Sequence, residues 1–169
     1  MKKNTLLFVV AVIVLAGLSA CNLSGDSNYT PRLMLYNPAE INTDSTLSME
    51  YTAEGNIKFD SLHVNDTVTI LVIGEGFVNN LEQLTITSNE ETDIKMLAPH
   101  DTIAQYFASE SDFINGKILL GDGIVGMSYP FKFVAKKATE KTKLNFELTS
   151  DAQDISNKAV LVVEFPIKP

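Results

Sequence analysis

The chain has 169 residues and a formal net charge of −8, with a single cysteine and no tryptophan. This length suits one domain with its own core. The acidic balance argues against a surface that binds nucleic acid or anionic lipid through charge, and one cysteine leaves no internal disulfide, so stability must come from the core.

Residues 1–20 have the layout of a secretory signal peptide. Lys2 and Lys3 supply a positive start, and residues 6–15 form an apolar run. A transmembrane helix needs about 20 apolar residues, which is more than this run contains. We therefore expect the first 20 residues to be removed on export, with an ordinary cleaved signal or an uncleaved anchor as the alternatives.

The end of this segment resembles the lipobox of bacterial lipoproteins. Its residues are Leu18, Ser19 and Ala20, followed by the only cysteine, Cys21. In that family the cysteine thiol receives a diacylglycerol and becomes the first residue, so the resemblance implies a lipid anchor, with acyl chains such as palmitate, at Cys21. Residues 21–30 are rich in Ser, Gly and Asn and indicate a flexible tether, and residues 31–169 form the predicted folded domain.

Apolar and polar residues alternate from Pro31 onward, as in β-strands. Residues 67–73 are β-branched and apolar almost throughout, which predicts a central strand buried on both faces. Pro130 predicts an edge strand or a strand start, and Pro166 is expected to end the last strand. The expected strands are residues 32–36, 47–52, 57–60, 67–73, 81–87, 94–96, 129–133, 144–148 and 159–165.

One helix is expected, over residues 101–109. Ile103, Tyr106 and Phe107 fall at helical spacing, and Asp101 is expected to cap the first turn. Short strands are the alternative, because Asn115-Gly116 soon afterwards predicts a hairpin turn.

Many strands at spacings of about 10 to 15 residues predict an all-β fold, an antiparallel β-sandwich of immunoglobulin-like topology. The Cys-Trp-Cys pattern of antibody domains is absent. A β-barrel is the alternative, and residues 47–60 are expected to form either an extra pair of strands or a small annex. The predicted core residues are Ile70, Val72, Ile86, Phe133, Phe146, Leu161 and Val163.

The folded part carries no catalytic motif, and the sequence predicts no cofactor and no metal. His63 and His100 stand apart, and no nucleophile elbow is present. Residues 150–154 lack the dense spacing of a calcium loop. We therefore expect that the protein is not an enzyme, with a glycan hydrolase that uses two carboxylates as the alternative. The carboxylates considered for that role are Glu90, Glu91, Asp122, Asp151 and Asp154.

Four triplets read Asp, then Ser or Thr, then an aliphatic residue or Thr, and they resemble the O-glycosylation acceptor of exported Bacteroidota proteins. Composition alone gives about one such triplet in a chain like this. The alternative is that Asp-Ser and Asp-Thr simply favour the starts of turns. With the lipobox, the triplets make the chain similar to small Bacteroidota envelope lipoproteins. The candidate hydroxyls are those of Ser45, Ser61, Thr67 and Thr102.

The function expected from these features is that of a non-catalytic binding or structural module, anchored to the outer membrane on its periplasmic face or at the cell surface. Its partners would be the membrane, through the lipid on Cys21, and an envelope protein or a glycan met through loops or an edge strand. The lack of tryptophan favours a protein over a glycan. A surface-filament subunit that exchanges residues 32–36 is a further alternative.

Overall fold

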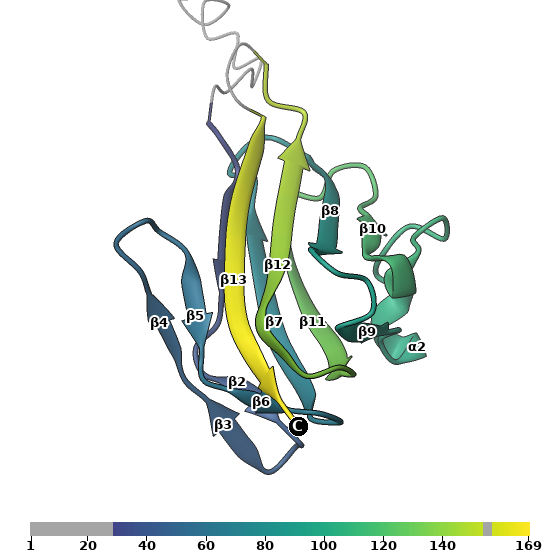
Figure 1. Cartoon of the computed structure of the whole chain (residues 1–169). Coiled ribbons are helices and arrows are strands. Elements are labelled where there is room, and N and C mark those ends of the chain that lie inside the picture. The colour runs from purple at the N-terminus through teal and green to yellow at the C-terminus, as the bar shows by residue number, and fades with distance from the viewer. Residues whose placement is uncertain (1–28, 154–156) are drawn as a thin grey trace, which may run out of the picture.

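Two β-sheets face each other across one apolar core in the computed structural model, which describes residues 29–153 and 157–169 (Figure 1). The first sheet runs in the order β3 (Ser45–Leu47), β2 (Ala39–Ile41), β7 (Thr67–Glu75), β11 (Gly126–Ala135) and β9 (Ile94–Leu97), and β1 (Arg32–Leu35) also pairs with β7. The second sheet runs in the order β10 (Lys117–Leu119), β8 (Leu81–Ser88), β12 (Thr139–Ser150), β13 (Lys158–Lys168), β5 (Ile57–Phe59) and β4 (Met49–Tyr51), and β6 (Leu62–His63) also pairs with β13.

The order of the strands is that of an immunoglobulin-like sandwich. In such domains strands A, B, E and D form one sheet and strands C, F and G the other. Here β1, β7, β11 and β9 take the first set of places and β8, β12 and β13 the second. The predicted sandwich is confirmed, and the two separate sheets replace the barrel alternative. The pairing is antiparallel except at β13, which pairs in parallel with the short strands β5 and β6.

The segment over residues 47–60 extends the two sheets and does not form a separate annex. Ser48 separates β3 from β4, so one predicted strand is split between the sheets. β3 pairs with β2 in the first sheet, while β4 pairs with β5 in the second. The extra strands therefore widen the sandwich on one side (Figure 1).

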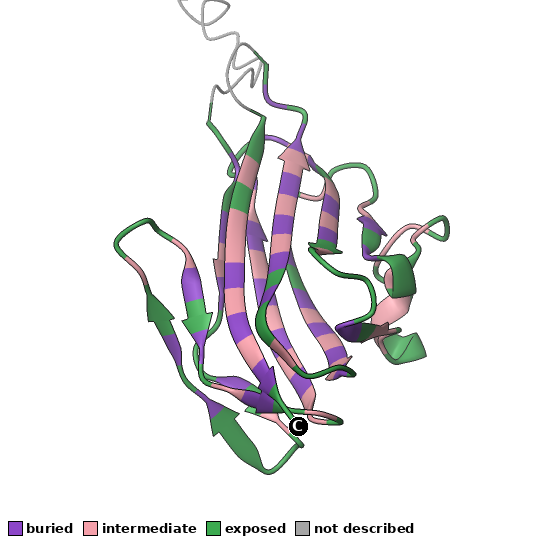
Figure 2. Ribbon diagram, viewed as in Figure 1, coloured by how far each residue is buried: buried purple, intermediate pink, exposed green. Residues whose placement is uncertain are grey.

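Alternating burial along the long strands builds the core (Figure 2). In β7 the even-numbered residues Val68, Ile70 and Val72 are fully buried, and their neighbours are half-buried. The prediction of burial on both faces was therefore wrong for β7, which is central within its sheet but has one face less covered than the other.

Six of the seven predicted core residues are buried, and the exception is Leu161. Leu161 is half-buried and packs against the margin of the core. It pairs with Phe146 of β12, but on the other side of β13 the pairing with β5 starts only at Val163. In the described part of the chain, the early part of β13 thus has a strand on one side only, which leaves Leu161 partly open to solvent.

Two prolines lie inside strands, at positions that do not donate to the ladder. Leu71 lies opposite Pro130, and its carbonyl accepts a hydrogen bond from the Tyr36 N–H on the side away from β11. The backbone nitrogen of Pro130 therefore points away from β7. On that side the pairing with β9 has already ended, so no hydrogen bond from Pro130 is needed. Pro166 falls where the register of β12 and β13 shifts. The prediction that Pro166 ends the last strand was therefore wrong, because bulges tolerate proline and β13 continues to Lys168.

The predicted helix is reduced to α2 (Asp101–Ala104), one turn long. Its N-cap is His100, whose ring nitrogen accepts from the Thr102 N–H, so the expected Asp101 cap was wrong. The chain then reverses at the 3-10 helix η1 (Phe113–Asn115) and the left-handed Gly116. The predicted reversal at Asn115-Gly116 is confirmed in this form.

Candidate binding groove between the two sheets

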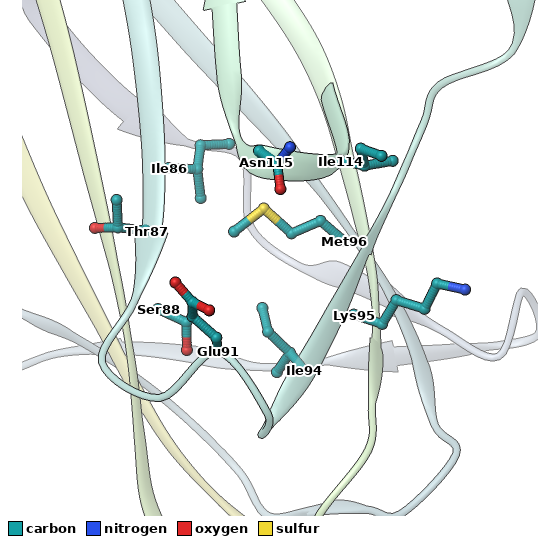
Figure 3. A pocket seen from close by; sticks show the side chains of 9 residues that line it. All are labelled: Ile86, Thr87, Ser88, Glu91, Ile94, Lys95, Met96, Ile114 and Asn115. Carbon is teal, nitrogen blue, oxygen red and sulfur yellow. The ribbon is translucent and has the colours of Figure 1, made fainter. Parts of the chain in front are cut away.

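A groove opens on the side of the sandwich where β8 of the second sheet and β9 of the first sheet diverge (Figure 3). We call it the edge groove, and its volume is about 510 Å³. It is lined by Ile86, Thr87, Ser88, Glu91, Ile94, Lys95, Met96, Ile114 and Asn115. These residues come from the two strands, the turn that joins them, and η1.

The edge groove exists because β10 is only three residues long. β10 pairs with residues 83–85 of β8 and leaves residues 86–88 without a strand on that side among the described residues. On the groove side of β10, the backbone hydrogen bond from the Ile86 N–H to the Gly116 carbonyl fastens the chain to β8. A Cβ at Gly116 would lie 2.1 Å from the Ile86 carbonyl oxygen and 3.1 Å from the Met96 sulfur, so only glycine permits this close approach.

β9 has a backbone edge that faces the groove. Its described strand partner is β11, through Lys95 opposite Val134 and Leu97 opposite Lys132. Backbone groups point alternately to the two sides of a strand, so those of Met96 point away from β11. Ser88 presents its backbone toward the groove in the same way, because the flanking Thr87 and Asn89 point to β12. Two strand edges that no described strand pairs with therefore border one hollow.

The side chains of the groove are largely apolar with a charged rim. Ile86 and Ile94 are buried, and Met96 lies between β9 and Ile86 (Figure 3). Ile114 is 60% exposed on the opposite wall. Glu91 and Lys95 are both exposed and carry opposite charges. The arrangement suits an uncharged extended chain with apolar side chains at alternate positions.

The lining of the groove lacks the pair of carboxylates considered for glycoside hydrolysis. It contains one carboxylate, that of Glu91, whereas glycoside hydrolysis requires two facing carboxyl groups. Among residues 29–153 and 157–169, no cluster of three or more His, Cys, Asp or Glu side chains is arranged to hold a metal ion.

The predicted lipidation site at Cys21 and the residues that resemble a lipobox, 18–20, lie outside the described residues. The four candidate glycosylation hydroxyls are scattered over the fold and do not meet in one site. Ser45 and Thr102 are exposed, as a glycan requires, whereas Ser61 and Thr67 are half-buried. The Thr102 hydroxyl lies 2.9 Å from the His100 ring nitrogen.

The other residues singled out in the sequence have local structural contacts. His63 is exposed, with its Nδ1 3.9 Å from an Asp66 carboxylate oxygen. Both oxygens of Asp151 accept hydrogen bonds from Asn80, one from the backbone and one from the side chain. This pairing joins two loops, and Asp154 lies outside the described residues.

The edge groove was not predicted from the sequence. The local signal for it is the short apolar run of β9 and the exposed Ile114 before a left-handed glycine, but neither indicates that two strands diverge there. Within the described part of the chain, no helix has the length and apolar character needed to cross a membrane. A comparison with protein-family models found no match, and a comparison with curated proteins found none either.

Proposed function

We propose that this protein is a lipid-anchored module of the bacterial outer membrane that binds an extended segment of a partner protein by strand addition at the edge groove. The unpaired edge of β9 beside an apolar hollow is the observation that carries the proposal. In strand addition the backbone bonds supply affinity, and the neighbouring side-chain pockets supply specificity.

The groove favours a peptide over a glycan. Its walls are aliphatic side chains and a methionine, whereas sugar rings are commonly bound on exposed aromatic faces, and none of the lining residues is aromatic. The backbone of Met96 offers one donor and one acceptor at the spacing of a β-ladder. A partner strand seated there would complete the first sheet beyond β9.

The anchor is proposed from the lipobox resemblance at Cys21. Two or three acyl chains hold a protein stably in a bilayer, because each buried CH₂ contributes about 0.8 kcal/mol. The Cys21→Ala variant is expected to lose palmitate labelling and leave the membrane fraction with the same melting temperature as the wild type. Palmitate labelling that persists in Cys21→Ala would overturn the assignment.

Met96→Pro tests strand addition directly. Proline removes the N–H that points into the groove and leaves Lys95 and Leu97, which pair with β11, unchanged. Losing this one bond should weaken partner binding by about tenfold, since an unpaired buried acceptor costs about 1 to 3 kcal/mol. Met96→Ala is the matched control, because it removes the same half-buried side chain, which packs against the core, but keeps the N–H, so the loss of binding should exceed that of Met96→Ala.

The partner is detected with a photo-crosslinking amino acid at position 114 in the full-length protein in cells. The same amino acid at Val160 is the matched control, because Val160 is also an exposed β-branched residue, 52% accessible, but lies on β13. We expect a protein adduct at position 114 that Met96→Pro abolishes. Equal adducts at both positions, or binding on a glycan array with no adduct at position 114, would contradict the proposal.

A further inference from the structure

The described chain begins at the end of the sandwich opposite the C-terminus (Figure 1). Four exposed apolar side chains belong to the segments that meet at this end. They are Tyr29 (63% exposed), Phe77 (46%), Val78 (57%) and Val125 (44%). We call this set the N-terminal pole. It combines the start of the chain with the connections β7 to β8 and β10 to β11.

Direct contacts between these segments hold the pole together as one surface. The rings of Tyr29 and Phe77 are 5.7 Å apart, and the Asn79 side chain donates to the Tyr29 carbonyl at 3.0 Å. The Gly76 N–H donates to the Val125 carbonyl at 2.8 Å. The apolar groups therefore project from segments that are hydrogen-bonded to one another.

The backbone of Phe77 makes its exposure notable. Its φ is 62°, in the left-handed region that bulky residues disfavour. Strained residues of this kind concentrate at functional sites. The strain here presents an aromatic ring to the outside instead of placing it in the core.

The pole carries one pair of opposite charges, and two further carboxylates, those of Asp122 and Asp151, lie on or beside the same connections. Arg32 pairs with Glu75, and its guanidinium lies 5.8 Å from the centre of the Phe77 ring. A tyrosine, a phenylalanine and an arginine beside aliphatic groups suit the interfacial region of a bilayer, where amphipathic side chains bury their apolar parts and keep their polar ends hydrated.

The length of chain before the domain limits which end can reach the membrane. From Cys21 to Tyr29 there are eight residue steps, which span at most about 29 Å when fully extended. β13 alone, with 11 residues, is roughly 36 Å long. The chain between Cys21 and Tyr29 is therefore too short to run the length of the domain, so the opposite end of the domain cannot face the membrane. The N-terminal pole is the end held near the lipid.

We infer that the N-terminal pole docks into the headgroup region of the bilayer that holds the Cys21 lipid. This inference rests on the lipid anchor of the proposed function. Docking fixes the orientation of the domain, with the N-terminal pole at the membrane. The edge groove then lies away from the membrane, because β9 pairs with the end of β11 that is distant from the pole.

The absence of tryptophan from the chain permits a clean test. Phe77→Trp places one fluorescent reporter at the pole, and Tyr106→Trp places one at a site that is 75% exposed near α2, as the matched control. The full-length lipidated variants are reconstituted in phosphatidylcholine vesicles, with and without brominated acyl chains. We expect a blue-shifted emission that brominated lipid quenches for Phe77→Trp, and an unshifted, unquenched emission for Tyr106→Trp.

A second change checks that the apolar surface causes docking. Adding Val78→Asp to Phe77→Trp should lower the docked fraction by about tenfold, because it replaces apolar contact with a charge. Unquenched Phe77→Trp in protein whose Cys21 lipid is seen by mass spectrometry would overturn docking and leave the anchor intact. A blue shift without bromine quenching would mean that protein, such as a second copy, covers the pole. Protein without lipid on Cys21 would overturn both the lipid anchor and the docking.

Discussion

Replacing Tyr129 with phenylalanine removes a buried hydroxyl that no other described residue hydrogen-bonds. Tyr129 lies on β11 and is fully buried. Its ring centre is 5.4 Å from that of Phe107 and 6.0 Å from that of Phe113. The ring is held by aromatic packing on two sides, so phenylalanine should occupy the same place.

The size of the effect at neutral pH follows from the unpaired hydroxyl. Burying a polar group without a partner costs about 1 to 3 kcal/mol, offset in part by the packing of the oxygen atom. We expect Tyr129→Phe to be at least as stable as the wild type at pH 7 and up to about 1 kcal/mol more stable.

At alkaline pH the difference should grow. Burial raises the pKa of Tyr129 from 10.0 to about 12. Below pH 10 the tyrosine is protonated in both the folded and the unfolded state and adds no pH dependence. Between pH 10 and 12 only the unfolded state releases the proton, so the wild type loses about 1.4 kcal/mol of stability per pH unit, or about 3 kcal/mol in total.

The assay is denaturant unfolding of both proteins from pH 7 to 11.5. The free energy of unfolding of Tyr129→Phe should exceed that of the wild type by a margin that widens above pH 10, while other titrating groups cancel in the difference. A constant margin would refute the argument from burial. A loss of more than about 2 kcal/mol at pH 7 would show that the hydroxyl is hydrogen-bonded.

Two further predictions concern the core and the groove. Val163→Asp should prevent folding, because an unpaired buried carboxylate costs several kcal/mol against a total stability of about 5 to 15 kcal/mol, whereas the half-buried Leu161→Asp should fold with a lowered melting temperature. Circular dichroism melts compare them, and equal melting curves would contradict the burial difference. Gly116→Ala should lower the melting temperature more than Gly55→Ala, since both glycines have positive φ but only a Cβ at Gly116 meets the Ile86 carbonyl, and equal losses would contradict the close approach.

Much of the local structure can be predicted from the sequence because it depends on side-chain period. The alternation in β11, β12 and β13 marks strands wherever one face meets a core, and enough of these strands in succession predict a sandwich. The lipobox resemblance at Cys21 stays a prediction of the sequence alone.

The features that depend on neighbours distant in the chain, such as the burial of particular residues and the pairing of strand edges, are decided only by the tertiary structure. Leu161 and Val163 look alike in the sequence, and only the reach of β5 makes one half-buried and the other fully buried. The edge groove arises because β10 stops at three residues and leaves β8 and β9 without a strand between them. Whether a strand edge is paired is a property of two distant segments, so no local pattern in β9 can encode its open edge, and the position of this candidate site emerges only when the sheets assemble.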